Sequence, residues 1–377
     1  MSNVLIIGGS FDPIHNGHLE IAKAAMDKIK TDEVWFMPAK NPRWKKLKTS
    51  QFDRLKMIKL AIKTNKKYKL CDYEIKNTGN KQINYTIDTM IALINKFPNN
   101  KFYYLIGTDQ LDRLGDWKRI EELSKLVVFV LINRVGYQKN QFNIAKYNVL
   151  DIGITGPLIS STIIRNFLHL DVPLLVKKYI KENGLYLENK LKIELSEYRF
   201  EHSKRVATLA KRIAKSNNVN VKKAYIAGLL HDCAKEINRE REVELMKMYF
   251  PEKLIYPRSV YHQFLSSIIA KKDYNIDDIE IINAMKYHAT ATDKMSKLAK
   301  IIYVADKIEP GRGYNSSAMI NLCMESINKG FKKVLEENID YLKSNITEFK
   351  LNNLTLEAYN KYIKGGKHEH KETRKSC

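Results

Sequence analysis

Cysteines and long hydrophobic runs are both scarce in this sequence. The four cysteines among 377 residues, Cys71, Cys233, Cys323 and Cys377, are scattered and form no CxxC pair, which excludes a disulfide framework and indicates reduced thiols in a cytoplasmic protein. The longest uncharged apolar run, near Leu126–Asn133, is far shorter than the ~20 residues of a membrane-spanning helix. The first residues, MSNVLIIGGSF, have no basic segment ahead of the apolar one, so we expect neither a signal peptide nor a membrane partner.

Acidic residues are outnumbered by basic ones, 42 to 65, which gives a formal net charge of +23. Residues 1–190 contain 31 basic and 18 acidic side chains, and residues 191–377 contain 34 and 24, so the excess is spread over the whole chain. A solvated lysine-rich surface explains this spread, an anionic substrate is the functional interpretation, and nucleic acid is a third. The even distribution and the lack of an aromatic–basic stripe argue against nucleic acid.

The length and composition predict two folded domains. Apolar residues make up 44% of the chain and charged residues 28%, which favours globular folding over disorder. Domains of roughly 100–200 residues would divide the chain in two, and we find no internal repeat. We place the domains at 1–189 and 190–363, with the boundary in the polar stretch Glu188–Lys192 and a polar tail at 364–377.

The first half alternates strand-like and helix-like segments. Strands are expected at Val4–Ile7, Val34–Met37, Phe102–Ile106 and Val127–Ile132, and helices at His18–Ile29, Phe52–Thr64, Thr86–Asn95 and near Val172–Glu182. Strands that alternate with helices predict an α/β domain with a parallel sheet. Sheets of this kind bind ligands at the carboxyl ends of their strands.

Strand signals stop after about Lys190. Apolar residues then recur at helical spacing in Arg199–Lys215, Val221–His231, Tyr261–Lys271, Ile279–His288 and Lys297–Lys307. The second half is therefore predicted to be all-α.

The densest motif of the first half is GGSFDPIHNGHL, which spans Gly8–Leu19 and follows the first predicted strand. Its two glycines would let the backbone approach a ligand, and His15 and His18 stand three residues apart where a helix is expected to begin. The N-terminus of a helix offers free N–H groups and the positive end of the helix dipole, which favour phosphate. The string as a whole predicts a polyphosphate site rather than a turn with incidental histidines.

A second string, ISSTIIRN at Ile159–Asn166, places three hydroxyl side chains at an expected helix N-terminus, with Arg165 one turn later. Hydroxyl groups and a guanidinium in this arrangement predict a second anion site. Taken alone, the string is equally compatible with an ordinary helix cap.

Together the two strings resemble the HxGH nucleotidylyltransferase superfamily and, within it, the bacterial nicotinate-nucleotide adenylyltransferase (NadD) family. The same family is matched by GTDQLDRLGDWKRIEEL at Gly107–Leu123, NYTIDTM at Asn84–Met90 and VWFMPAKNP at Val34–Pro42. The resemblance covers roughly residues 1–188. Where the family often has a His-Lys pair, this chain has RWK at 43–45, which leaves open the role of Lys45 or Lys46 at the phosphates.

The resemblance implies a Rossmann-like fold that transfers AMP from ATP, with Mg²⁺, to nicotinate mononucleotide, giving deamido-NAD and pyrophosphate in NAD biosynthesis. The substrate's own phosphate attacks, so the enzyme supplies positioning and charge stabilisation. The resemblance implies that His15, His18 and Arg165 make the catalytic contacts. It implies a nicotinate mononucleotide site of Thr86, Trp117 and Lys118. The implied ATP site consists of Gly8, Gly9, Ser10, Phe11, Gly107, Asp109, Ile159, Ser160 and Ser161. Preference for nicotinate over nicotinamide mononucleotide is left open.

Six histidine and aspartate residues of the second half are candidates for a site, and a His…His-Asp…Asp pattern among them could bring four ligands to one divalent metal. They are His202, His231, Asp232, His262, His288 and Asp306. Asp306 stands inside the apolar segment IIYVADKIEP, where an unpaired buried carboxylate would be costly. Imidazole and carboxylate ligands favour iron, manganese or zinc over calcium. We therefore expect this helical half to hold a divalent metal.

This pattern resembles the HD-domain phosphohydrolases and, among them, the YqeK-like iron-dependent symmetrical diadenosine tetraphosphate hydrolases. The matching segments are Tyr198–Ala210, Leu229–Glu236, Ser259–Ala270 and Ala284–Arg312. The resemblance implies metal ligation by His202, His231, Asp232 and Asp306 and polyphosphate binding by Arg199, Lys235, His262, His288, Ala289 and Arg312, with His262 and His288 at the phosphates or at a second metal. It implies iron, manganese or another divalent ion, and two ADP as products from diadenosine tetraphosphate.

The two resemblances together predict a bifunctional enzyme. Two alternatives stay open for the second half: a metal-containing regulatory module that senses a nucleotide, and a phosphohydrolase of another nucleotide. The sequence is compatible with a homo-oligomer and does not reveal the metal's identity or number.

Overall fold

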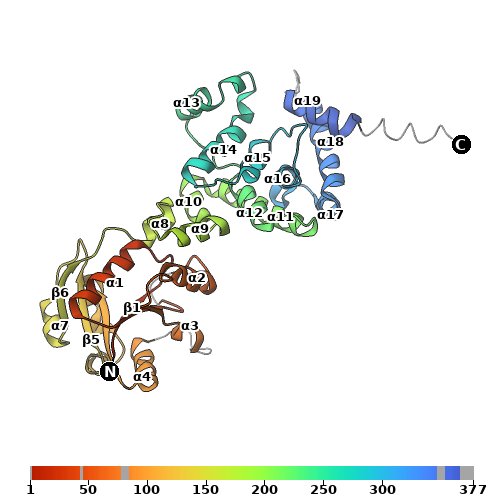
Figure 1. Cartoon of the computed structure of the whole chain (residues 1–377). Coiled ribbons are helices and arrows are strands. Elements are labelled where there is room, and N and C mark those ends of the chain that lie inside the picture. The colour runs from red at the N-terminus through yellow and green to blue at the C-terminus, as the bar shows by residue number, and fades with distance from the viewer. Residues whose placement is uncertain (1, 43–45, 78–84, 346–352, 366–377) are drawn as a thin grey trace. The chain divides into compact units, whose positions relative to one another are not determined.

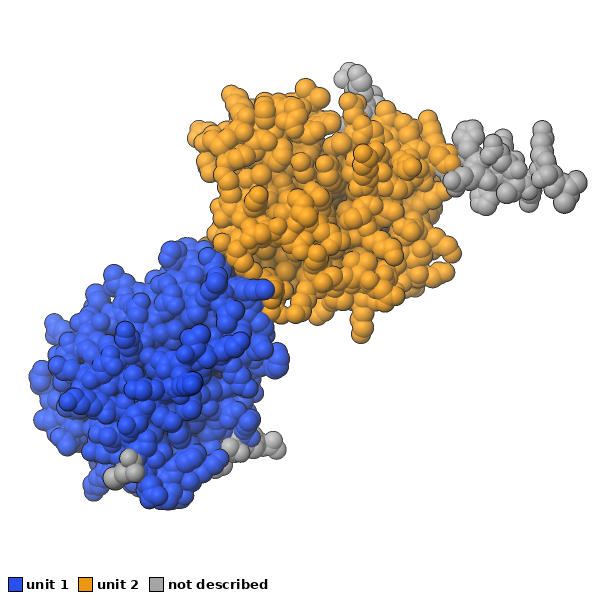
Figure 2. Space-filling view, viewed as in Figure 1, with its two compact units in different colours: residues 1–180 blue, residues 181–377 orange. Residues whose placement is uncertain are grey.

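The computed structural model describes residues 2–42, 46–77, 85–345 and 353–365. The chain divides into two compact units, Met1–Ile180 and Lys181–Cys377, which Figure 2 shows in blue and orange. The segment at 43–45, Asn84 and the tail from residue 366 onward lie outside the described residues. Over the part of the chain that is described, no helix has both the length and the apolar character needed to span a bilayer.

The first unit is built on six parallel strands in the order β3-β2-β1-β4-β5-β6, which confirms the predicted parallel sheet. The strands are β1 (Ser2–Gly9), β2 (Glu33–Pro38), β3 (Tyr68–Leu70), β4 (Asn100–Gly107), β5 (Val128–Asn133) and β6 (Leu150–Thr155). The order reverses direction between β1 and β4 at the middle of the sheet. Ligands of such sheets bind in the crevice that this reversal opens at the carboxyl ends.

Helices connect the strands, and two more, α8 (Ser161–Phe167) and α9 (Leu174–Asn183), follow the last strand (Figure 1). The connecting helices are α1 (Asn16–Ile29), α2 (Gln51–Ala61), α3 (Tyr73–Asn77), α4 (Thr86–Lys96), α5 (Thr108–Leu111), the 3-10 helix η1 (Leu114–Asp116), α6 (Ile120–Leu126) and α7 (Gln141–Lys146). The central strand β1 buries Val4 to Ile7 almost completely, as expected for a parallel strand covered on both faces.

The sequence pattern does not predict the two edge strands. β3 has only three residues, and β6 carries an aspartate and a glycine, Gly153, with a positive φ of 69°. Edge strands bury fewer side chains than central ones, and β6 has a single fully buried residue, Ile152. Their apolar pattern is correspondingly weak, so pairing with β2 and β5 decides their conformation.

The second unit is helical, and its described residues contain no strand, which confirms the all-α prediction. Its helices are α10 (Leu187–Glu194), α11 (Glu197–Ser216), α12 (Val221–Leu230), α13 (Arg239–Tyr249), η2 (Pro251–Lys253), η3 (Arg258–Val260), α14 (Tyr261–Asp273), α15 (Ile279–Lys286), α16 (Lys297–Ile308), η4 (Pro310–Arg312), α17 (Ser317–Glu325), α18 (Ile327–Asn345), α19 (Asn353–Tyr359) and the π-helix η5 (Asn360–Lys364). The division between the units falls before the expected boundary at residue 189, because α10 packs against α11 of the second unit.

Close packing of α11 on α12 brings two of the predicted ligands together. A Cβ atom at Gly228 would lie only 2.9 Å from Cα of Ala207, so only glycine allows this approach without a shift of the backbone. Gly228 stands three residues before His231, and Ala207 stands five residues after His202. The glycine therefore helps to set the separation of these two imidazoles.

Candidate active sites in the two units

The loop after β1 and the start of α1 form the first candidate site. His15 precedes α1 at the N-cap position, and its backbone N–H donates to Nδ1 of His18 at 3.2 Å. Because Nδ1 of His18 accepts this bond, the proton of the neutral His18 ring lies on Nε2. The centroids of the two rings are 3.7 Å apart. The pair thus stands at the positive end of the α1 dipole, as the sequence predicts.

His15 is 5% exposed, and its Nδ1 atom is buried without a hydrogen-bond partner. Burial lowers the pKa of His15 to about 4, Asp171 opposes this shift, and Arg134 reinforces it. The imidazole is therefore neutral at pH 7 in the protein without ligand. A buried nitrogen atom without a partner beside a helix N-terminus fits a site for a polar ligand group.

This pKa shift predicts an acid-sensitive stability. The pKa of His15 is lower in the folded chain than its ordinary value of 6.5, so the unfolded chain binds the proton more readily. The folded state therefore loses up to about 3 kcal/mol of stability as the pH falls from 6.5 to 4. Over this pH range we expect the free energy of unfolding to fall by about 3 kcal/mol more in the wild type than in a His15→Gln variant, which lacks the titrating imidazole. All three tryptophans lie in residues 1–180, so urea unfolding followed by tryptophan fluorescence reports this unit. Parallel pH curves for the two proteins would refute the expectation.

Gly17 brings the second predicted string against the first. A Cβ atom at Gly17 would lie 2.7 Å from side-chain carbons of both Pro157 and Ile159 and 3.1 Å from Nδ1 of His15. Glycine is therefore required for the loop before α8 to pack on the start of α1.

For the AMP transfer that the family resemblance implies, we expect Gly17→Ala to lower kcat/KM roughly 100-fold, because the added methyl group displaces the histidine pair by a fraction of an ångström or more. Steady-state kinetics with ATP as the varied substrate measure the effect. Gly115→Ala is the matched control, since the nearest atom to its new methyl group, Oη of Tyr147, is at an ordinary 3.5 Å. Equal kinetics for the two variants would contradict the packing argument.

The hydroxyl and guanidinium groups of the second string bind the chain itself. The Ser160 hydroxyl accepts from the Ile163 N–H at 3.3 Å and so caps α8, and the Ser161 hydroxyl donates to the carbonyl of Pro13 at 2.9 Å. Arg165 donates from Nη1 to the carbonyl of Asp12 at 2.7 Å. The two strings thus meet, but the serine hydroxyls that the sequence assigns to an anion act within the loop.

Two arginines that the sequence motifs do not include hold the strand ends. Arg54 of α2 is fully buried and donates from Nη1 to the carbonyls of Ser10 and Ala39 at 2.9 and 2.8 Å, which ties the loop after β1 to the loop after β2. Arg134, after β5, pairs through Nε with Asp109 at 3.1 Å. Arg54 lies on the same helix face as the buried Met57 and Ile58. A basic residue on an apolar helix face is the one feature of the sequence that could have pointed to the role of Arg54.

Two of the three residues assigned to nicotinate mononucleotide lie beside Tyr104 of β4. Trp117 packs edge-on against Tyr104 with ring centroids 6.0 Å apart, and the Tyr104 hydroxyl is hydrogen-bonded to Thr86. That hydroxyl also occupies the space in which a Cβ atom of Gly8 would stand. Nζ of Lys118 lies 3.3 Å from Asp88. The structure therefore brings Thr86, Trp117 and the end of β1 together.

The second candidate site lies inside the helical unit, where α11, α12, α14, α15 and α16 gather (Figure 1). Its six predicted residues are His202 on α11, His231 and Asp232 directly after α12, His262 on α14, His288 after α15 and Asp306 on α16. All six are buried, with at most 8% of any residue exposed. The structure thus places the four expected ligands, His202, His231, Asp232 and Asp306, close to His262 and His288.

Each carboxylate of this cluster lies between imidazoles. Oδ1 of Asp306 is 3.3 Å from Nε2 of His202 and 3.5 Å from Nε2 of His231. Oδ1 of Asp232 is 3.3 Å from Nε2 of His262 and 3.4 Å from Nε2 of His288. Within the described residues, three overlapping sets of three have donor atoms that all lie within 4.8 Å of one another, a separation that suits a shared cation.

The hydrogen bonds around the cluster aim its nitrogen atoms inward. Nδ1 of His231 donates to the carbonyl of Gly228, and Nδ1 of His288 to that of Met285, each at 2.7 Å. Nε2 of His202, Nε2 of His231 and Oδ1 of Asp232 are buried without a hydrogen-bond partner. Histidine ligands of metals are held by such outer hydrogen bonds. The residues present therefore fit a divalent metal ion.

The charges of the cluster suit a cation as well. Burial disfavours the charged form of Asp232, but His231 and the other imidazoles outweigh it and hold the pKa of Asp232 well below its usual range. Burial lowers the pKa of His262 to about 3, so this ring is neutral and its nitrogen lone pair remains available. Burial also disfavours a charge on His231, but Asp232 and Asp306 outweigh it and raise its pKa, so a metal ion would take the place of its proton. Carboxylates and imidazoles together form a donor set that iron, manganese and zinc accept.

Basic side chains surround the cluster. Arg199 lies 3.6 Å from Asp232, Lys235 lies 3.0 Å from Nδ1 of His262, and Arg312 donates to the backbone carbonyl of Asp306 at 2.9 Å. Lys307, which the sequence motifs do not single out, lies 2.9 Å from Asp306. The N–H of Ala289, expected at the polyphosphate, instead donates to the buried side chain of Gln263 at 3.2 Å.

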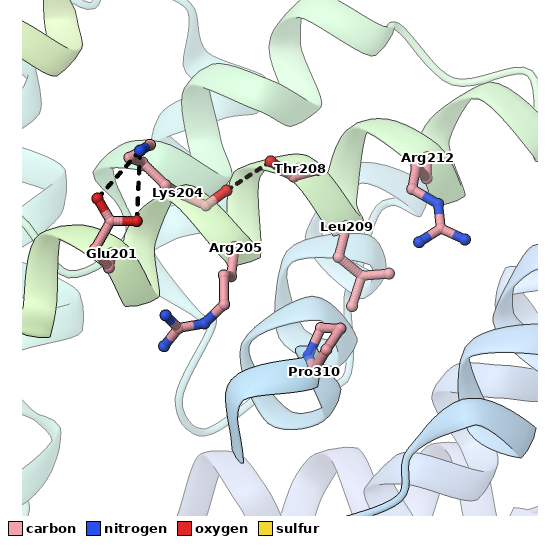
Figure 3. Close-up of a pocket in the computed structure, with 7 residues that line it drawn as sticks. All are labelled: Glu201, Lys204, Arg205, Thr208, Leu209, Arg212 and Pro310. Carbon is pink, nitrogen blue, oxygen red and sulfur yellow. Dashed lines mark hydrogen bonds and ion pairs between the residues drawn. The ribbon is translucent and has the colours of Figure 1, made fainter. Parts of the chain in front are cut away.

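A cavity of about 260 Å³ lies on the outer side of α11, beside η4 (Figure 3). Its lining consists of Glu201, Lys204, Arg205, Thr208, Leu209, Arg212 and Pro310. Arg205 connects this cavity with Glu309, a residue that is 1% exposed. Burial disfavours the charged form of Glu309, but Arg205 and His202 outweigh it and lower its pKa.

Comparison with known proteins agrees with this division of the chain. The cytidylyltransferase-like family matches residues 6–167, and the HD domain family matches residues 199–311. The probable nicotinate-nucleotide adenylyltransferase/Ap4A hydrolase of Mycoplasma genitalium is 36% identical over 311 residues, which cover 82% of this chain and 88% of that protein. The protein of the same description from Mycoplasma pneumoniae is 32% identical over 342 residues, which cover 88% and 98%.

A shorter relative, named for one activity, matches about half of the chain. The nicotinate-nucleotide adenylyltransferase of Bacillus subtilis is 36% identical over 194 residues, which cover 49% of this chain and 99% of that protein. The long matches, by contrast, extend through both units. The chain therefore belongs to the family of two-domain proteins that join a nicotinate-nucleotide adenylyltransferase domain to an HD domain of the Ap4A hydrolase type.

Proposed function

We propose that the chain is a bifunctional enzyme. The first unit transfers AMP from ATP to nicotinate mononucleotide, giving deamido-NAD and pyrophosphate. The second hydrolyses Ap4A, diadenosine tetraphosphate, symmetrically to two ADP. The names of the relatives that match both units support this pair of activities.

For the first reaction, the histidine pair at the start of α1 carries the proposal. The phosphate of nicotinate mononucleotide attacks the α-phosphorus of ATP, the bond to the β-phosphate breaks, and pyrophosphate leaves. The chain then has to orient the phosphates and stabilise the developing negative charge. We assign this role to His15, His18 and the N–H groups at the start of α1, with Arg165 holding the loop. Mg²⁺ accompanies ATP, and Trp117 and Lys118 would receive the nicotinate ring and its carboxylate.

The direct test of this reaction supplies the purified chain with ATP, Mg²⁺ and either nicotinate or nicotinamide mononucleotide. We expect deamido-NAD and pyrophosphate with nicotinate mononucleotide, measured by chromatography. Product from neither mononucleotide would overturn the first half of the proposal.

For the second reaction, the three buried donor atoms without partners carry the proposal. We assign metal ligation to His202, His231, Asp232 and Asp306, with His262 and His288 at the phosphates or at a second ion. A bound iron or manganese ion would act as a Lewis acid and supply a nucleophilic water at neutral pH. Arg199, Lys235 and Arg312 would neutralise the charge of the polyphosphate. The six residues of the cluster are buried, which limits the access of bulk water to the metal ligands.

Incubation of the full chain with Ap4A and Fe²⁺ or Mn²⁺ tests this second activity. We expect ADP as the only nucleotide product, since cleavage at the centre of the bridge gives two identical halves. AMP and ATP together would indicate asymmetric cleavage. Tight binding of Ap4A without any hydrolysis would favour a nucleotide-sensing module instead.

A further inference from the structure

Glu309 belongs to neither the predicted ligand set nor the proposed phosphate contacts, yet it is among the most buried acidic residues of the second unit. It follows α16 directly, precedes η4, and is 1% exposed. A buried carboxylate is costly unless its oxygen atoms are bonded. The partners of Glu309 therefore indicate why the fold retains it.

Three groups hold this carboxylate. Oε1 of Glu309 lies 3.1 Å from Nδ1 of His202. Oε2 accepts from Nε of Arg205 at 2.7 Å and from the N–H of Gly311 at 2.6 Å. Both oxygen atoms are therefore bonded, and one of them contacts a proposed metal ligand on the side away from the cluster.

The chemistry of the pair determines which nitrogen of His202 carries the proton. A carboxylate only accepts hydrogen bonds, so Nδ1 of His202 is the donor and Nε2 keeps its lone pair. Nε2 is the atom that lies 3.3 Å from Asp306 and has no hydrogen-bond partner. His231 and His288 obtain the same orientation from neutral backbone carbonyls, whereas His202 obtains it from a full negative charge.

We infer that Glu309 is a positioning residue of the metal centre: it fixes the tautomer of His202 and increases the basicity of Nε2, and Arg205 holds it in place from the cavity beside α11. This inference rests on the proposed metal centre. Outer carboxylates of this kind commonly account for a 10- to 100-fold difference in metal affinity. In Figure 3 the Arg205 side chain extends from α11 toward the turn that carries Pro310, the residue next to Glu309.

The test is the affinity of the full chain for Mn²⁺, measured by competition with a chelator. We expect Glu309→Gln to raise the dissociation constant roughly 10- to 100-fold. The amide has no charge and only one acceptor oxygen, so its NH₂ group would have to face a donor, either Nδ1 of His202 or the guanidinium of Arg205. Arg205→Met leaves the carboxylate in place but less firmly held, so a smaller increase is expected. Arg212→Met is the matched control, because this arginine lines the same cavity without contacting Glu309. The affinity of this variant for Mn²⁺ should equal that of the wild type.

Two further measurements separate positioning from a general structural role. The absorption bands of the Co²⁺-substituted protein should shift in Glu309→Gln, because the ligand field of His202 changes. The effect of Arg205→Met should shrink when Glu309→Gln is already present, since both act through the same carboxylate.

Three results would overturn the proposed role of Glu309. Unchanged Mn²⁺ affinity and an unchanged Co²⁺ spectrum in Glu309→Gln overturn it while leaving the metal centre intact. If Glu309→Gln does not fold, Arg205→Met decides, and wild-type affinity in that variant overturns the inference. A wild-type chain that binds no Mn²⁺ overturns both the inference and the metal centre on which it rests.

Discussion

Replacement of His231 by alanine is expected to abolish hydrolysis of Ap4A by the second unit. His231 is fully buried, its Nε2 atom has no hydrogen-bond partner, and it lies 3.5 Å from Asp306 and 3.8 Å from Asp232. The variant therefore loses one ligand and leaves two carboxylates without the imidazole between them. Metal affinity should fall by more than the roughly 10- to 100-fold effect of an outer hydrogen bond. Metal analysis and release of ADP measure the two effects.

The neighbouring cysteine provides the matched control for this variant. Cys233 is also buried and belongs to the same motif, but its Sγ atom faces the carbonyl of Ser266 at 3.6 Å rather than the cluster. Burial raises the pKa of its thiol, so it stays protonated and is a poor ligand. We expect Cys233→Ala to keep both metal and activity. Metal content at the wild-type level in His231→Ala would contradict the proposed ligand set.

The second large effect is expected from His18→Ala in the first unit. The His18 ring accepts the backbone N–H of His15 through Nδ1 and so presents a proton on Nε2 at the N-terminus of α1. Loss of one donor that stabilises a developing negative charge typically lowers kcat 100- to 1,000-fold. We expect a decrease of this order in the rate of deamido-NAD formation, with a smaller change in the KM for ATP, because the contact strengthens as pyrophosphate leaves.

Two comparisons isolate this effect. His169→Ala changes an exposed histidine of the same unit and should leave the rate unchanged. Tryptophan fluorescence of His18→Ala should also equal that of the wild type, because all three tryptophans lie in residues 1–180 and report whether this unit is folded. A His18→Ala enzyme with the wild-type kcat would remove the histidine pair from the proposed mechanism.

Much of the fold is predictable because its signals are local. Apolar runs such as Val4–Ile7 predict the central strands, and helical spacing predicts segments such as α11 and α16. The edge strands β3 and β6 are not predicted, since they bury few side chains and depend on pairing with a neighbour. The helices α13, α17 and α18 are not predicted either. Local signals are therefore informative where a segment is largely buried.

The sequence by itself determined which chemistry the two units carry, because HNGH, HD and the lone aspartate at position 306 are short patterns whose residue types already limit the ligands. Only the tertiary structure decided how these groups are supported. Arg54 reaches the loop after β1 from 44 positions away, and Glu309 reaches His202 from 107 positions away. No periodicity in the chain encodes such pairings, since they arise when helices and strands pack and buried polar groups must find partners wherever the fold places them.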